Sequence, residues 1–245
     1  MIAASPSFDF RLIDTPAGSL PCIVRGPKHG PQVLIVPPLF EEMNRARALL
    51  AGIGRRLATR GIGSWLPDLP GTGDSAVALT EIGWADWRAA VSEMAEHIAA
   101  TSGQASNIFS IRGGALLDDA APAAAWYRLA PVAAGDRLLR ELLRTRLAAD
   151  QERGTPTTLA ALEASLAAAT VELGGYPITP ALAASLRNAV AAPVAPLRTA
   201  TVGSGDADRL FDGPPVWRQA EPPALPILAA DIADDIADWI AQCAR

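Results

Sequence analysis

Short apolar runs and alternating apolar and polar positions mark the strands expected in the first part of the chain. Residues 8–13 alternate between apolar and polar, and residues 20–24 form a second short β-like run after a Pro-Ala-Gly turn, which is typical of an antiparallel hairpin at the edge of a sheet. Residues 32–36 and 63–67 are short and mostly apolar, as strands covered on both faces require. The pattern therefore predicts two edge strands and two buried ones.

Helices are expected between these strands, because apolar side chains return there every three or four residues. The spacing predicts one helix over residues 42–60, which ends at Gly61, and another over residues 84–100. A further apolar run over residues 107–111 predicts the next buried strand. Strands and helices in alternation indicate an α/β fold with a mostly parallel, doubly wound sheet.

The second half of the chain continues the alternation and adds a run of helices. Strands are expected at residues 123–129, 197–202 and 217–221, and helices at 136–150, 159–173, 180–190 and 228–244. No repeat or linker interrupts the pattern, so we expect a single domain over residues 1–245. Within it, about residues 131–190 are expected to form a small helical cap or insert over the carboxyl edge of the sheet.

The helix expected at residues 136–150 has leucines on one face and arginines on the other. These arginines are Arg137, Arg140, Arg144 and Arg146. The simplest interpretation is a solvated face, and the alternative is a docking patch for an acidic partner.

The composition narrows the classes of function. A chain of 245 residues with 50% hydrophobic and 19% charged residues can bury a full α/β core, and a net charge of −5 gives no electrostatic case for binding nucleic acid. Cys22 and Cys243 are expected to be reduced or buried thiols. No secretory signal is visible, and no apolar segment reaches the roughly 18 residues of a membrane span. We therefore expect a cytoplasmic protein with no membrane span.

A glycine-rich turn at residues 68–75 follows the second buried strand. It could be mistaken for a phosphate-binding loop, but it lacks the lysine and the spacing of a P-loop. We therefore expect no nucleotide, and the sequence indicates no other cofactor and no metal site.

The stretch over residues 107–117 carries the clearest functional pattern: a strand, a tight turn of small residues, and an apolar segment suited to a helix. That order is typical of a nucleophile elbow, in which the motif G-x-S-x-G places a serine at the tip. Aligned on this motif, Ser110 and Gly114 take the two small-residue positions and Arg112 takes the position of the nucleophile. Arginine stays protonated in proteins, so Arg112 cannot attack an ester carbonyl as a serine does.

The base of a catalytic triad is missing from the sequence as well. It should be a histidine after the last strand, whereas His29 and His97 both precede the elbow. Asp206 and Asp208 stand where a triad acid could be. With no base to orient, they are interpreted as part of a turn with the neighbouring glycines.

Unconventional groups are left as candidates for catalysis. Ser110 lies at the end of the strand before the elbow, and Ser75 lies in the glycine-rich turn, where capping or closing the turn is the simpler role. Glu41 or Glu42 could activate a bound water as a general base. The catalytic candidates are therefore Arg112, Glu41, Glu42 and Ser110, and the pattern confirms none of them.

Arg112 has two further interpretations. It forms an internal ion pair with Glu41 or Glu42, or it holds an anionic group at the carboxyl edge of the sheet, where open α/β sheets bind ligands. In the second case, free N–H groups of the helix expected after the elbow would help to bind the anion. The ligand-binding residues would then be Arg112, Leu39, Phe40, Glu41 and Gly113.

Several of these segments resemble a known family. Residues 37–44, which read Pro-Pro-Leu-Phe-Glu-Glu-Met-Asn, the turn at 68–75 and the elbow resemble the α/β-hydrolase superfamily. More narrowly, residues 37–44, 174–176 and 213–217 are similar to the exosortase A system-associated hydrolase 2 family. Members of that family are encoded beside bacterial exopolysaccharide and protein-sorting genes, and they tend to have arginine at the elbow.

The resemblance implies an α/β-hydrolase fold. The residues and the resemblance together leave three functions open. The first is a pseudoenzyme, a non-catalytic or atypical member that binds a small anionic or acyl ligand, or a partner protein of an exopolysaccharide or protein-sorting pathway. The second is an active ester or thioester hydrolase, or an acyltransferase, that uses unconventional groups. The third is a module that docks on a partner enzyme through the arginines of the helical insert.

Overall fold

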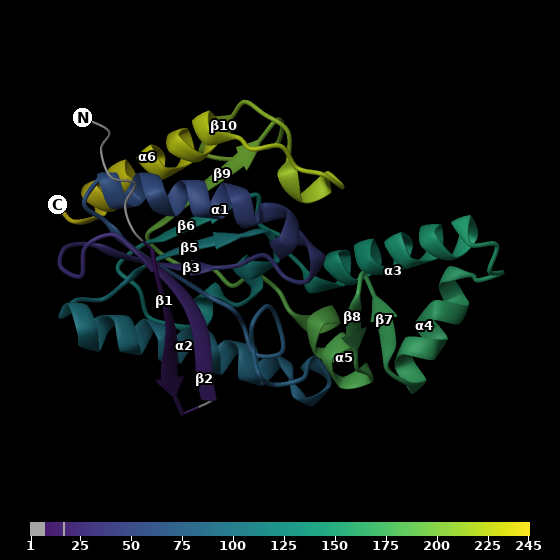
Figure 1. Ribbon diagram of the computed structural model, residues 1–245. Helices are drawn as coiled ribbons and strands as arrows, with labels where there is room; N and C mark the ends of the chain where they lie inside the picture. The colour runs from purple at the N-terminus through teal and green to yellow at the C-terminus, as the bar shows by residue number, and fades with distance from the viewer. Residues whose placement is uncertain (1–7, 17) are drawn as a thin grey trace.

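An eight-stranded sheet forms the centre of the protein in a computed structural model that describes residues 8–16 and 18–245 (Figure 1). Its strands are β1 (Phe8–Thr15), β2 (Gly18–Arg25), β3 (Gln32–Val36), β4 (Gly63–Pro67), β5 (Asn107–Ile111), β6 (Trp126–Leu129), β9 (Leu197–Val202) and β10 (Arg209–Phe211). They lie in the order β1-β2-β4-β3-β5-β6-β9-β10. β1, β2 and β4 are antiparallel neighbours and the other pairs are parallel, which confirms the mostly parallel sheet and the edge hairpin.

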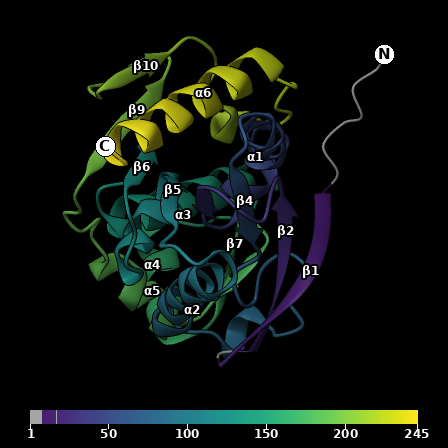
Figure 2. The ribbon, with the colours of Figure 1, turned by 90° about the vertical axis from the view of Figure 1, so that its left-hand side faces the viewer.

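Three long helices cover the two faces of this sheet. α1 (Glu41–Thr59) and α6 (Pro226–Cys243) pack together on one face, and α2 (Trp84–Ser102) covers the other (Figure 2). The helical spacing of apolar residues is confirmed, since the predicted inward residues of α1 are all buried: Ala46, Leu49, Leu50, Ile53 and Leu57. Each face of the sheet has its own apolar core, and the core under α2 extends into the segment that follows β6.

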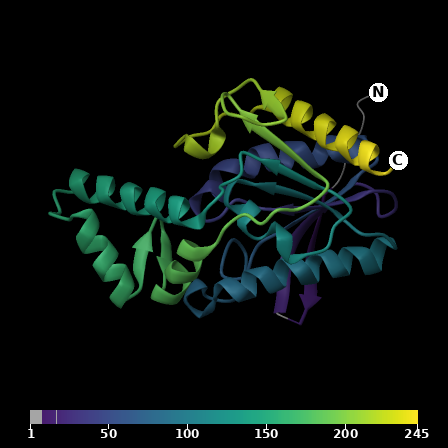
Figure 3. The ribbon, with the colours of Figure 1, turned by 180° about the vertical axis from the view of Figure 1, so that it is seen from behind.

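That segment lies between β6 and β9 and extends beyond one end of the sheet (Figure 3). It consists of α3 (Gly135–Glu152), α4 (Leu159–Ala168), the hairpin of β7 (Val171–Leu173) and β8 (Tyr176–Ile178), and α5 (Pro180–Asn188). The four leucines Leu138, Leu139, Leu142 and Leu143 of α3 are buried, as their spacing predicts. The arginine side chains of the opposite face are more exposed, for example 69% for Arg137 and 60% for Arg140.

The helix expected immediately after the elbow is replaced by two short 3-10 turns, Arg112–Leu116 and Asp118–Ala120. Asp118 is drawn into the core by an ion pair with Arg128 of β6, and Pro122 lies two residues after the second turn. A five-residue 3-10 turn does not supply the aligned N–H groups of a longer α-helix. The prediction of an α-helix immediately after the elbow is therefore wrong.

Two other predicted elements differ from the structure. The helix expected at 159–173 ends at Ala168, because Gly174 and Gly175, with φ of 59° and 83°, form the turn of the β7–β8 hairpin. The strand expected at 217–221 is wrong, because the 3-10 turn Val216–Arg218 stands there between proline-rich segments. The last strand is β10, which pairs with β9.

Two of the predictions for the N-terminal part of the chain fall on residues that the structure does not describe. Residues 1–7, which would belong to a secretory signal, and Ala17, in the predicted hairpin turn, lie outside the described residues. Among the residues that the structure describes, no helix has the length and apolar character needed to span a bilayer.

Candidate functional site

A cleft opens where β5, β6 and β9 end, at the edge of the sheet where open α/β sheets bind ligands. Its volume is about 430 Å³. Its lining includes Arg112 after β5, Arg137 of α3, Arg218, and the loop over residues 203–207 after β9. We call this the arginine cleft.

Arg112 occupies the tip of the elbow and is held in place by the protein. Its φ is 54°, the left-handed region in which the tip residue of a strained turn lies. Its side chain is only 8% exposed, and its Nε donates to Glu42 Oε1 at 2.9 Å while its Nη2 donates to Glu141 Oε2 of α3 at 3.2 Å. The guanidinium carbon also lies 5.6 Å from the ring centre of Trp217. Its Nη1 donates to the Ala130 carbonyl oxygen at 3.5 Å, so each guanidinium nitrogen of Arg112 has a protein partner.

Of the two glutamates proposed as partners for Arg112, the structure pairs it with Glu42. Glu41 instead forms an ion pair with Arg45, at 3.4 Å, on the same helix. Burial raises the pKa of the Glu42 carboxyl above its ordinary value, and the ion pair with Arg112 opposes this only in part. Among the described residues, Glu42 Oε2 is buried with no hydrogen-bond partner, which is consistent with the raised pKa.

Ser110 is engaged in a different ion-paired cluster beneath the elbow. It is fully buried, and its hydroxyl donates to Asp118 Oδ2 at 2.6 Å. Asp118 also accepts two hydrogen bonds from Arg128, at 2.7 and 2.8 Å. A serine whose hydroxyl donates to a buried carboxylate is neither exposed to a substrate nor next to a histidine base. No sequence pattern assigned a role to Asp118 or Arg128, and the one available signal was an Asp-Asp pair in an otherwise apolar segment.

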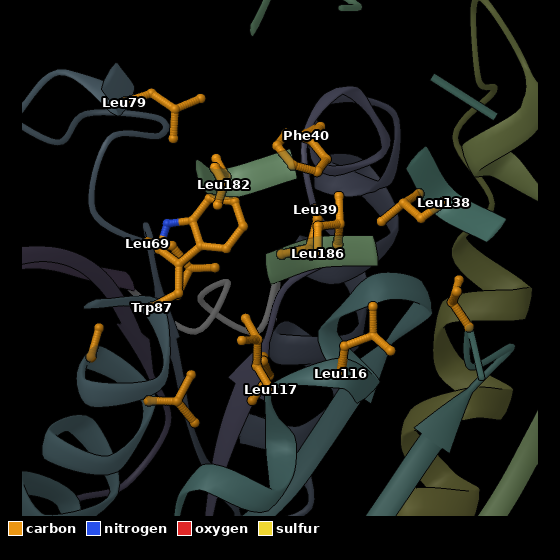
Figure 4. Close-up of a cluster of buried hydrophobic side chains, with 14 of the residues drawn as sticks. Leu39, Phe40, Leu69, Leu79, Trp87, Leu116, Leu117, Leu138, Leu182 and Leu186 are labelled. Carbon is orange, nitrogen blue, oxygen red and sulfur yellow. The ribbon is translucent and has the colours of Figure 1, made fainter. Parts of the chain in front are cut away.

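Apolar side chains fill the space on the other side of the elbow. Leu39 and Leu138 pack so close to Gly113 that a Cβ there would lie 2.9 Å from Leu138 and 3.0 Å from Leu39. Figure 4 shows both leucines in a buried cluster with Leu116, Leu117 and residues of α2 and α5. Phe40, with φ of 58°, packs on Trp87 and Tyr176 with ring centres 5.6 Å apart in both cases. The residues proposed to bind a ligand are therefore split: Arg112 lines the arginine cleft, whereas Leu39, Phe40 and Gly113 lie in the apolar cluster.

Glu41 and Glu42 line a second cavity, of about 370 Å³, between α1 and α3. Its lining also includes Leu39, Arg45, Glu141 and Arg144. Trp217 and Arg218 border both this cavity, which we call the α1–α3 groove, and the arginine cleft. The two hollows therefore flank the side chains that surround Arg112.

The other residues considered for catalysis lie in separate parts of the structure. His29 is exposed in the loop before β3, and His97 of α2 is half-buried with its ring centre 5.7 Å from that of Trp65, so neither lines the arginine cleft. Asp208 accepts hydrogen bonds from the Thr199 backbone N–H and hydroxyl, both at 2.8 Å, as expected for a turn residue. Asp206 lines the arginine cleft. Ser75 closes the glycine-rich turn by accepting from the Gly71 N–H at 2.9 Å.

Other reactive groups of the described residues are remote or absent. Cys22 and Cys243 are free, and burial raises the pKa of the Cys22 thiol to about 12. Within the described part of the chain, no group of three or more histidine, cysteine, aspartate or glutamate side chains could hold a metal ion.

Comparison with known proteins identifies the fold. No protein-family model matches the sequence, and no curated protein sequence does either. Solved structures do match: an esterase from Thermogutta terrifontis with malate bound has a TM-score of 0.57 at 13% identity, over 97% of this chain and 99% of its own. A thioesterase domain from the curacin biosynthetic pathway has a TM-score of 0.55 at 14% identity, covering 96% and 99%. The mouse alpha/beta hydrolase domain-containing protein 10 has a TM-score of 0.54 at 14% identity, also covering 96% and 99%.

The protein therefore has the α/β-hydrolase fold, which confirms the fold expected from the sequence. At 13–14% identity the likeness concerns the fold alone, because one fold supports many chemistries. Within this fold, the tip of the elbow carries Arg112 in a buried ion pair.

Proposed function

We propose that this is a non-catalytic α/β-hydrolase-fold protein that binds an anionic ligand, a carboxylate or a phosphate, in the arginine cleft. The observation that carries the proposal is Arg112 at the elbow tip, held by Glu42 and Glu141 where a nucleophile would stand. The hydroxyl of Ser110 is bonded to Asp118, and no histidine lines the cleft. Acyl transfer on this fold needs a nucleophile and a base together, so this arrangement supports binding over turnover.

The charge of the cleft supports an anionic ligand. Arg112, Arg137 and Arg218 line it, against the single carboxylate of Asp206. Arg218 is exposed and makes no ion pair with any described residue, and the Arg137 side chain is 69% exposed with one 3.5 Å contact to Glu141. In the proposed complex Arg137 and Arg218 donate directly to the anion, since planar guanidinium groups suit carboxylate and phosphate oxygens. Arg112 lines the cleft beside them, with its own charge paired with Glu42 and Glu141.

The resemblance of residues 37–44 to the exosortase A system-associated hydrolase 2 family supports a narrower role. In this part of the proposal the protein acts in bacterial exopolysaccharide assembly or protein sorting, and a protein of that pathway is its partner. The elbow arginine that members of that family tend to have is consistent with Arg112 in this chain.

One observation favours a second function, hydrolysis of an ester or thioester by a bound water. Glu42 has a raised pKa and an unpartnered Oε2, and it lines the α1–α3 groove beside the elbow. A carboxylate of this kind can act as a general base. This alternative requires turnover that depends on Glu42, whereas the main proposal requires binding that depends on Arg137 and Arg218.

Isothermal titration calorimetry with two probes, inorganic phosphate and malate, tests the main proposal at low ionic strength. Malate is the ligand bound to the Thermogutta terrifontis esterase. We expect saturable binding to the wild type, and about tenfold weaker binding to Arg137→Gln and to Arg218→Gln, because each removes a charge-assisted hydrogen bond. Arg140→Gln is the matched control, since Arg140 lies on the same helix, pairs with Asp136 and does not line the cleft. Absence of binding, or equal weakening by all three variants, contradicts the proposal.

A further inference from the structure

β1 is an edge strand with an unusually open outer side. No described strand pairs with it on the side away from β2, and it lies at the rim of the molecule (Figure 2). Phe8, Phe10 and Leu12 alternate along one face of β1 and are 58%, 51% and 63% exposed. Over its eight residues β1 contains no proline and no lysine, two of the residues that commonly protect edge strands from pairing.

The backbone of β1 offers its free hydrogen-bonding groups at those same three residues. Pro21 stands opposite Leu12 in the β1–β2 hairpin, and its carbonyl accepts from the Asp68 N–H, on the side of β4. The Leu12–Pro21 pair is therefore a non-hydrogen-bonded pair of the hairpin, so the N–H and C=O of Leu12 point to the outer edge. By the alternation of an antiparallel ladder, those of Phe10 and Phe8 do the same.

The outer edge is complementary to itself in one register. If two copies of β1 pair antiparallel about a two-fold axis at Phe10, then Phe8 stands opposite Leu12 and Phe10 opposite Phe10 of the second copy. In the same register Asp9 stands opposite Arg11, and Arg11 opposite Asp9. These two side chains share one face, because they form an ion pair of 2.7 Å within the strand. Apolar residues thus meet apolar residues on one face, and opposite charges meet on the other.

We propose that β1 is the interface of a homodimer, in which two sheets join edge to edge in this Phe10-centred register. Strand addition of this kind is a common mode of recognition, in which main-chain hydrogen bonds supply affinity and side-chain pairs set the register. The symmetric arrangement also closes, since the same surface of both copies is used and no free β1 edge is left. In the dimer, Phe8, Phe10 and Leu12 pack side by side against Leu12, Phe10 and Phe8 of the second copy.

The apolar face of β1 continues onto neighbouring elements of the same chain. Ile23 of β2 and Leu66 of β4 are half-buried, and together with Phe10 and Met43 they border a shallow hollow. This surface lies beside α1 on the face that α1 and α6 cover elsewhere. In the dimer the two apolar faces form one continuous apolar surface across the two-fold axis.

Sedimentation equilibrium of the full chain over a wide range of concentrations tests the proposal. The wild type is expected to form a species of twice 25.5 kDa. Asp9→Arg places like charges opposite each other at two symmetric positions and should weaken the dimer roughly fivefold or more. Asp9→Arg with Arg11→Asp restores opposite charges in the same register, and it should restore the dimer.

Two further variants keep the test independent of folding effects. Phe10→Lys changes an exposed side chain and brings two like charges together at the two-fold axis, so it should also give monomers. Ile227→Lys is its matched control, an equally apolar residue that is 77% exposed on α6, and it should leave the dimer unchanged. Circular dichroism establishes that each variant is folded.

The proposal is overturned if the wild type stays monomeric at every concentration. It is also overturned if a dimer forms that Asp9→Arg and Phe10→Lys do not weaken. If the folded charge-swap variant remains as monomeric as Asp9→Arg, the Phe10-centred register is wrong.

Discussion

Replacing Arg112 with alanine tests whether the elbow arginine is a structural ion-pair partner. The change leaves the carboxyl of Glu42, buried with a side chain 10% exposed, without its partner. Breaking a buried ion pair by removing one partner costs about 3–5 kcal/mol. Because the pKa of Glu42 is already raised, protonation of this carboxyl limits the loss, and we expect about 3 kcal/mol at neutral pH. Glu141 adds little, since its side chain is 37% exposed and also contacts Arg137.

Two matched variants separate the ion pair from the backbone strain. Arg112→Gly removes the same side chain but adopts φ of 54° without strain, so it should be about 1 kcal/mol more stable than Arg112→Ala. Arg112→Met with Glu42→Leu replaces the pair with apolar groups of similar size, and it should recover most of the loss. Urea denaturation followed by circular dichroism measures all four proteins. A loss below about 1 kcal/mol in Arg112→Ala would show that the ion pair does not hold the elbow.

Three other predictions follow from the buried groups. Ser110→Ala should lower the free energy of unfolding by about 2 kcal/mol, measured by urea denaturation, because it removes a buried hydrogen bond to a carboxylate; an unchanged midpoint would contradict the Ser110–Asp118 contact. The pKa of Glu42 is raised in the folded state, so this carboxyl should stabilise the protein less as the pH rises above the ordinary glutamate value of 4.5. The free energy of unfolding of the wild type, minus that of Glu42→Gln, should therefore fall with rising pH. Denaturation at several pH values measures this difference, and a difference that rises or stays constant would refute the prediction. A thiol reagent should label Cys243 in the native protein much faster than Cys22, which is buried with a pKa of about 12; equal rates, read by mass spectrometry, would contradict the burial of Cys22.

The order of strands and helices could be predicted from the sequence because it depends on local patterns. The run Gln32–Val36 is buried throughout, and the helical spacing in α1 is long enough to identify one face. Local patterns did not predict the conformation of a short segment that depends on contacts with residues far away in the sequence. The segment around Trp217 looks like a strand, but it forms a 3-10 turn and places the indole over Arg112.

The candidate site could be predicted only in part. Alignment on the elbow motif alone shows that Arg112 replaces the serine nucleophile. The segment after β3 and the elbow meet at the carboxyl edge of the sheet, so an ion pair between Arg112 and Glu42 was one of the predicted alternatives. The role of Glu141 could not be predicted, because it depends on how α3 lies over the elbow. The hydrogen bond of Ser110 to Asp118 was equally hidden, because the turn after the elbow is too short and irregular for a helical pattern to place Asp118.

The central claim is that the elbow is non-catalytic because Arg112 and its ion pairs stand in place of a nucleophile. The most direct test is the hydrolysis of a panel of short-chain and long-chain acyl esters and thioesters by the purified wild type, Arg112→Ala, Glu42→Gln and Ser110→Ala. We predict rates for all four folded proteins that equal the rate without protein. Turnover by the wild type well above that background, and lost in any one of these variants, would contradict the claim and identify the group that acts.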